Sequence, residues 1–229
     1  ESLQILGKTA EWKDPETAYH VARVAYYSKL LAKNVGLTEE YQDMIYYASP
    51  FHDIGKVGIP DKVLLKAGRL NDEEYNVMKK HPAIGYEILK DSKSKYLRMG
   101  AEISLTHHER YDGSGYPSGL VGEDIPISGR IVALADVFDA LTSVRPYKSA
   151  WTFEDALDLL EDESGKHFDP KLVKLFMENI SSVKDIYSTF ELNYDTIGFI
   201  PQNPFTSLSM MTKIKDQFLP CKTSSKLTS

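Results

Sequence analysis

The sequence predicts an all-α protein of about seven or more helices. Apolar residues recur at helical spacing through most of the chain, so that several segments each have one apolar face. Helix-start signals precede some of these segments. Asp14-Pro15 and Asp169-Pro170 place a capping aspartate before a proline, and Asn71-Asp72-Glu73-Glu74 has the spacing of a capping box. The composition, with 42% hydrophobic and 26% charged residues, is that of an ordinary globular protein.

The N-terminal half carries most of the boundary signals. The helix from Asp14 runs to about Asn34, and Gly36 ends it. Thr38 caps the next helix, which leads toward Phe51. A new helical turn begins at His81-Pro82, because proline disfavours a helical conformation in the residue before it. In order along the chain, we expect helices at residues 14–34, 38 to about 51, 71–80, from 82 onward, 95–108, 129–143, 152–163 and 170–179.

The C-terminal half contains the predicted core helix. Residues 129–143 are the most apolar segment, although Asp136 and Asp139 interrupt it. A buried carboxylate is costly unless it is paired or bound to metal, so at least one of these two needs a partner. The glycine- and proline-rich segment 111–127 predicts a functional loop. After about Ser181 the helical pattern fades, and we expect an irregular extension without chemistry of its own.

Charge and cysteine content exclude several classes of protein. The net charge of −6 argues against a protein that binds DNA or RNA polymers through a broad basic face. Cys221 is the single cysteine, so no internal disulfide can form, which fits a reducing, cytoplasmic location. No apolar run approaches the roughly 18 residues that span a bilayer. The chain begins at Glu1 rather than methionine, which suggests an excised fragment that has lost upstream domains.

Potential metal ligands gather around the dipeptide His52-Asp53. Gly55 follows it and supplies a bend that lets both side chains reach one metal. Glu16 and His20 stand four residues apart, on one face of their expected helix. Taken singly, each of these residues is typical of a protein surface. Together, however, they favour a helical metallohydrolase. The full set is Glu16, His20, His52, Asp53, His81, His107, His108 and Asp136.

Two adjacent histidines indicate that the site holds more than one ion. Side chains of neighbouring residues on a helix diverge by about 100°, so His107 and His108 reach one site only if that site is wide or the helix frays. The remaining histidine, His167, lies beside the Asp169-Pro170 helix start and is interpreted as structural. Imidazole and carboxylate ligands without thiolate suit Fe or Mn. Two such ions about 3.5–4 Å apart activate a water for phosphodiester hydrolysis, and Lys56 is well placed to hold a phosphate oxygen.

The ordered series of motifs resembles the HD-GYP family, a branch of the HD-domain phosphohydrolases that degrades cyclic di-GMP. The resemblance covers roughly residues 10–178. It implies a helical HD-domain bundle with a GYP loop, followed by the irregular C-terminal extension. The matching segments are Glu16-x3-His20-x2-Arg23-Val24, His52–Asp61, His81-Pro82, His107–Pro117, Asp136–Thr142, Arg145–Lys148 and Phe168–Pro170.

Carried over residue by residue, the resemblance implies roles for the candidate residues. The eight residues of the set become metal ligands for two or three divalent ions, with Asp53 bridging two of them and Glu16 allowing the third. Asp53 and Lys56 would act in catalysis. Substrate contacts are implied for Lys56, Tyr116, Asp139, Arg145 and Lys148.

The implied activity is metal-dependent hydrolysis of cyclic di-GMP to pGpG, and whether hydrolysis continues to GMP stays open. Three alternatives stay open: cleavage of another cyclic dinucleotide such as cyclic GMP-AMP, a catalytically silent module that binds cyclic di-GMP or docks a protein, and an HD-type oxygenase. The resemblance also implies docking of diguanylate cyclase (GGDEF) domains through the GYP loop and an upstream receiver or sensory domain. We expect a connector at residues 1–13, a catalytic domain at 14–180 and an extension at 181–229.

Overall fold

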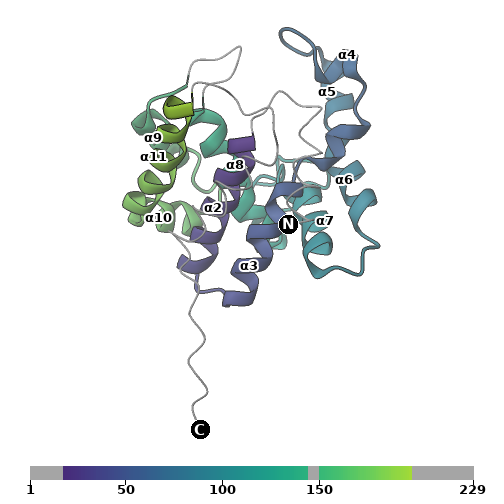
Figure 1. The fold of residues 1–229 in the computed structure, drawn as a ribbon. Coiled ribbons are helices and arrows are strands. Elements are labelled where there is room, and N and C mark those ends of the chain that lie inside the picture. The colour runs from purple at the N-terminus through teal and green to yellow at the C-terminus, as the bar shows by residue number, and fades with distance from the viewer. Residues whose placement is uncertain (1–17, 144–149, 198–229) are drawn as a thin grey trace. The chain divides into compact units, whose positions relative to one another are not determined.

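The computed structural model describes residues 18–143 and 150–197, and regular structure in these ranges is helical throughout, which confirms the all-α prediction (Figure 1). The helices, in chain order, are α2 (Ala18–Asn34), α3 (Glu39–Ala48), η1 (Ser49–Phe51), η2 (Ile54–Gly58), α4 (Asp61–Leu64), α5 (Asp72–Met78), α6 (His81–Leu89), α7 (Lys95–Thr106), η3 (Gly122–Asp124), α8 (Ile127–Thr142), α9 (Phe153–Asp162), α10 (Pro170–Glu178) and α11 (Ile180–Ile197). The chain divides into two units, Glu1–Tyr187 and Ser188–Ser229, and the packing below is that of the first.

Helices α2, α7 and α8 form the core that positions the site. α2 packs against α3 and α8, while α7 packs against α6, α3 and α8. The ring centroids of Tyr27 on α2 and Phe138 on α8 lie 5.4 Å apart, edge to face, and both side chains are completely buried. Ile131 and Leu134 of α8 are completely buried as well. The prediction that residues 129–143 form the core helix is therefore confirmed.

The predicted helix boundaries in the first half of the chain rest on the expected capping residues. The Thr38 hydroxyl accepts a hydrogen bond from the Tyr41 amide at 3.2 Å. Asn71 and Glu74 form a complete capping box, with both hydrogen bonds at 2.8 Å. Gly36 ends α2 with φ +87°, a left-handed conformation that favours glycine.

Several boundaries differ from the prediction, and two of the differences matter most. α7 ends at Thr106, so His107 and His108 lie beyond the helix rather than on it. The expectation of irregular structure after about Ser181 was wrong as far as residue 197, because α11 is helical from Ile180 to Ile197. Val183 and Ile186 are buried, and the Tyr187 ring packs 5.8 Å from that of Phe153. These contacts stabilise a helix whose own sequence pattern is weak.

Three predicted site residues, Glu16, Arg145 and Lys148, lie outside the described residues, as do residues 198–229. Among the helices that are described, none is long and apolar enough to cross a membrane.

Candidate metal centre

Seven of the eight proposed ligands come together at the junction of five segments. α2 supplies His20, the bend between η1 and η2 supplies His52 and Asp53, and the first residue of α6 is His81. His107 and His108 follow α7, and Asp136 lies on α8. They form two groups, each with ligand atoms within 4.8 Å of one another: Asp53, His81, His107 and His108 in one, and His20, His52 and Asp136 in the other.

The two groups adjoin through His52. Its Nε2 atom lies 3.4 Å from Asp53 Oδ2 in the first group and 3.8 Å from Asp136 Oδ1 in its own. His20 Nε2 lies 3.5 Å from the same Asp136 oxygen. The two groups therefore form one continuous cluster.

The histidine tautomers are set by the backbone. Nδ1 of His52, His81 and His107 lies 2.9 Å from a carbonyl oxygen, of Ser49, Met78 and Ser104 respectively. A carbonyl only accepts, so each Nδ1 must carry the proton and donate it. In the neutral imidazole each Nε2 is thereby left with a lone pair, as metal binding requires.

The atoms that face the centre of the cluster have no hydrogen-bond partner. Nε2 of His52, His81 and His107 and Oδ1 of Asp53 are buried and unbonded among the described residues. His81 Nε2 lies 3.1 Å from Asp53 Oδ1, and His107 Nε2 lies 3.6 Å from it. Buried lone pairs that face one another are costly unless a cation lies between them. The donor set thus fits divalent metal ions.

The end of α7 explains how both adjacent histidines reach the cluster. Beyond Thr106 the chain turns, and the Glu109 amide donates back to the Thr106 carbonyl at 3.0 Å. The ring centroids of His107 and His108 are 4.0 Å apart, and the His108 ring lies 4.9 Å from that of His81. One of the two alternative conditions raised by the sequence is therefore met, since the helix has ended before His107 and His108.

In the larger group, electrostatics favour neutral forms of His107 and His108 and a charged Asp53. Burial lowers the pKa of His107 and, more strongly, that of His108. Burial raises the pKa of Asp53, but the charges of Lys56 and His52 outweigh it and hold the pKa well below its usual range. For His52, burial lowers the pKa, yet the neighbouring Asp53 and Asp136 carboxylates raise it to about 10. That rise reflects a local negative potential, which attracts cations.

Asp139 lies behind the candidate ligand His20. Its carboxylate is completely buried, and His20 Nδ1 lies 2.8 Å from Oδ2. Arg23 pairs with the same carboxylate and donates to Ser143 Oγ at 2.6 Å. Burial raises the pKa of Asp139, but Arg23 and His20 lower it below its ordinary value. The substrate contact implied for Asp139 stays a prediction, while the structure shows its carboxylate buried and bound to His20 and Arg23.

Gly55 is required for a reason that the sequence interpretation did not give. A β-carbon at this position would lie 1.9 Å from the His81 carbonyl oxygen and 2.5 Å from the Gly85 amide nitrogen. Glycine is thus required so that η2 can lie directly against α6, whereas the sequence interpretation gave its role as supplying a bend. The close approach brings Lys56 to the cluster, where its Nζ lies 2.7 Å from Asp53 Oδ2.

Tyr116 lies over the cluster on the loop that follows α7. Its ring stacks on His108 with centroids 4.8 Å apart and planes inclined by 26°. Its amide donates to the His108 carbonyl at 3.2 Å. Burial raises the pKa of the Tyr116 phenol beyond its usual range, with smaller contributions from Tyr75 and Asp53. Tyr116 is therefore a neutral aromatic wall of the centre.

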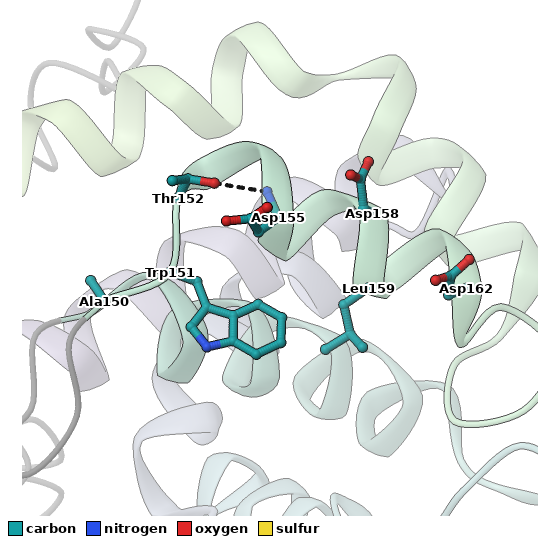
Figure 2. Close-up of a pocket in the computed structure, with 7 residues that line it drawn as sticks. All are labelled: Ala150, Trp151, Thr152, Asp155, Asp158, Leu159 and Asp162. Atoms are coloured by element: carbon teal, nitrogen blue, oxygen red, sulfur yellow. Dashed lines mark hydrogen bonds between the residues drawn. The ribbon is translucent and has the colours of Figure 1, made fainter.

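The pocket in Figure 2 is a separate feature. Trp151 and Leu159 supply its apolar surface, and the carboxylates of Asp155, Asp158 and Asp162 project from one face of α9 around it. None of the cluster residues lines this pocket. It is therefore not part of the candidate centre.

Sequence reasoning missed the supporting residues. Arg23 stands three residues after His20, a spacing that places both on one helical face and was a usable signal. Glu109 is buried, although the glycine-rich segment that follows it is mostly half-buried or exposed. His167 belongs to neither ligand group, and its ring stacks on Phe168 with centroids 4.2 Å apart.

Comparisons with known proteins agree with this geometry. A family model described as HD domain matches residues 4–172. The chain is 49% identical over 190 residues to the cyclic di-GMP phosphodiesterase response regulator RpfG of Xanthomonas campestris, covering 83% of this chain and 50% of the relative. It is 49% identical over 187 residues to a cyclic di-GMP phosphodiesterase of Thermotoga maritima, covering 82% and 51%.

Two further similarities involve Vibrio cholerae. A 3'3'-cGAMP-specific phosphodiesterase 2 is 51% identical over 179 residues, covering 78% of this chain and 34% of the relative. The crystal structure of a cyclic GMP-AMP specific phosphodiesterase shares the fold, with a TM-score of 0.61 at 19% identity, covering 95% of this chain and 59% of that one. The chain thus spans about half or less of the length of these curated relatives. From the family match and these identities, the chain belongs to the HD domain family.

Proposed function

We propose that this chain is the catalytic part of a metal-dependent phosphodiesterase that hydrolyses cyclic di-GMP to pGpG and then to GMP. The observation that carries the proposal is the set of buried, unbonded Nε2 atoms of His52, His81 and His107 around the Asp53 carboxylate. Two relatives at 49% identity are named cyclic di-GMP phosphodiesterases, which supports the substrate. The catalytic domain would comprise residues 14–180.

The centre would hold two or three divalent ions, Fe or Mn. His81, His107 and His108 would bind one ion and His20, His52 and Asp136 another, with Asp53 between them; Glu16 would bind a third. When bound, such ions supply an activated water and neutralise the phosphate charge. Their ligand set of imidazole and carboxylate without sulfur favours Fe or Mn over structural zinc.

The chain's own cations would orient the phosphate. Lys56 Nζ already lies 2.7 Å from Asp53, at the edge of the cluster, and an ammonium has three donors, so it can share one with a phosphate oxygen. Tyr116 would contact the substrate beside His108. Arg145 and Lys148 would complete the set of substrate contacts. Because the ligand carboxylates carry fewer charges than two or three divalent ions, the loaded site would attract a dianionic substrate.

We infer a regulatory setting from the family resemblance and from the length of the relatives. A receiver or sensory domain would precede the fragment in the full protein, and GGDEF domains would dock on the GYP loop around Tyr116. The enzyme would act on a cytoplasmic second messenger.

A second candidate substrate is cyclic GMP-AMP, favoured by the relative at 51% identity that is named as specific for it. A panel of cyclic dinucleotides separates the two. Protein loaded with Mn²⁺ or, without oxygen, with Fe²⁺ is incubated with cyclic di-GMP, 3'3'-cyclic GMP-AMP and cyclic di-AMP, and products are followed by chromatography. The proposal predicts fastest conversion of cyclic di-GMP to pGpG. Faster cleavage of cyclic GMP-AMP would identify that dinucleotide as the substrate instead. Metal binding without any cleavage would favour a catalytically silent binding module.

The oxygenase alternative has its own test. Oxygen consumption by the Fe²⁺-loaded protein with cyclic di-GMP is expected to stay at the level of the protein without substrate. Substrate-dependent consumption would contradict phosphodiester hydrolysis as the reaction of this centre.

A further inference from the structure

The Glu109 carboxylate is buried beside the metal centre, yet it is not a member of either ligand group. Its side chain belongs to a residue that is only 2% exposed, directly after His108. A buried carboxylate requires strong compensation, by a cation or by several hydrogen bonds. The groups that compensate the Glu109 carboxylate therefore indicate its role.

Backbone amides of the following loop surround this carboxylate. The Ser118 amide donates to Glu109 Oε1 at 2.7 Å, and the Leu120 amide donates to Oε2 at 3.1 Å. Each carboxylate oxygen thus binds one amide on the far side of Tyr116-Pro117. Hydrogen bonds from amides to a charged acceptor are stronger than those between neutral groups.

The loop also folds closely onto the backbone around Glu109. A β-carbon at Gly115 would lie 2.2 Å from the Arg110 nitrogen and 2.6 Å from the Glu109 carbonyl carbon. The Tyr116 amide donates to the His108 carbonyl just before Glu109. The ring of Tyr116 is therefore held between two fixed points, the His108 carbonyl on one side and the Glu109 carboxylate on the other.

We propose that Glu109 is a positioning residue: by binding the Ser118 and Leu120 amides, it holds Tyr116 against His108 in the geometry that receives the cyclic dinucleotide. The role in substrate binding rests on the proposed function. The two hydrogen bonds from the Ser118 and Leu120 amides to Glu109, which we call the loop clamp, rest on the contacts alone. Glu109 acts through Tyr116 and touches neither metal nor substrate.

The clamp can be tested without turnover. Hydrogen exchange followed by NMR or mass spectrometry on the intact chain is expected to show slow exchange of the Ser118 and Leu120 amides in the wild type. Glu109→Gln, which keeps one acceptor oxygen, and Glu109→Ala, which keeps none, should raise exchange across residues 110–121 in that order. Glu123→Gln, an exposed glutamate in the same region, is the matched control. If both amides of the wild type exchange as fast as those of an unstructured peptide, the clamp is overturned, whether or not the variants fold.

The substrate role is tested by separating KM from kcat. For cyclic di-GMP, Glu109→Ala should raise KM roughly tenfold, by the usual cost of losing charged hydrogen bonds, with metal content and kcat close to the wild type. In a double variant with Tyr116→Ala, the Glu109 change should add little, because the two residues act together. Fully additive effects, or loss of metal in Glu109→Gln, would overturn the positioning role. If the wild type itself cuts no cyclic dinucleotide, the proposed function fails while the exchange result still decides the clamp.

Discussion

His20 Nδ1 and Asp139 Oδ2 lie 2.8 Å apart inside the protein, which ties a ligand on α2 to the completely buried carboxylate on α8. A carboxylate that accepts a hydrogen bond from Nδ1–H leaves Nε2 free to bind metal and raises the basicity of the imidazole. The same carboxylate neutralises Arg23. One buried side chain therefore both orients a ligand and joins the two core helices.

Replacing Asp139 with asparagine tests this relationship. The amide keeps the size of the side chain but removes the charge that orients His20 and pairs with Arg23. We expect metal affinity to fall by about 10–100-fold, the usual effect of losing such a supporting carboxylate. The free energy of unfolding should also fall by about 3 kcal/mol, since a buried arginine loses its partner. Competition with a chromophoric chelator measures the first and urea unfolding the second.

Asp169→Asn is the matched control for that experiment. Asp169 forms another largely buried ion pair, with its Oδ2 2.6 Å from Nη1 of Arg130, outside the cluster. The control should lose stability but keep its metal affinity. Equal loss of metal affinity in both variants would show that Asp139 acts through general stability and not through His20.

The Gly55→Ala substitution tests the close packing of η2 on α6. The added methyl group would lie 1.9 Å from the His81 carbonyl oxygen, a backbone atom that cannot rotate away. We expect a loss of about 2–3 kcal/mol in unfolding free energy from overpacking, together with weaker metal binding because His81 and Asp53 move apart. Thermal unfolding and metal analysis measure the two effects.

Gly58→Ala provides the comparison within the same short helix. Its β-carbon would meet the side chain of Ile84 at 3.0 Å, and a side chain can shift. This variant is expected to bind metal as the wild type does. Similar behaviour of the two variants would contradict the specific requirement for glycine at position 55.

His167 predicts a pH dependence of stability. Burial, with the nearby Arg110 charge, lowers the pKa of its imidazole to about 4, against about 6.5 in the unfolded chain. Between these values the unfolded chain binds a proton that the folded protein does not, so the free energy of unfolding falls as the pH decreases. From pH 7 to pH 5 this loss should reach about 1–2 kcal/mol. Above pH 7 the contribution should be constant.

Urea unfolding of the wild type and His167→Gln at pH 7 and pH 5 isolates this effect, since the other titrating groups are common to both proteins. The variant should lose less stability on acidification. An identical loss in the two proteins would mean that His167 titrates normally in the folded state.

The sequence was sufficient to predict most of the longer helices and the residues that gather at the centre, because strong local signals mark them. Thr38 and Asn71 cap their helices as expected, and histidines stand next to helix ends. Asp136 and Asp139 were harder to separate. Their spacing of three residues gives both the same helical face, and only burial and the partner on α2 distinguish a candidate ligand from its support.

Other features depended on contacts between distant segments, which local patterns do not record. The end of α7 at Thr106 has no glycine or proline signal. α11 is stabilised by tertiary packing of Val183 and Ile186. The need for Gly55 arises from the His81 backbone, 26 residues later in the chain. Each of these required the assembled fold.

The most direct test of the metal centre is the metal content of protein purified without oxygen, measured together with hydrolysis of cyclic di-GMP. The wild type is compared with a His52→Ala/Asp53→Ala variant and with His167→Ala, a histidine substitution outside the cluster. The account predicts two or three Fe or Mn ions per chain and pGpG formation in the wild type and in His167→Ala, and loss of both in the double variant. Hydrolysis that persists in the metal-free double variant, or a wild type that binds no metal after reconstitution, would contradict it.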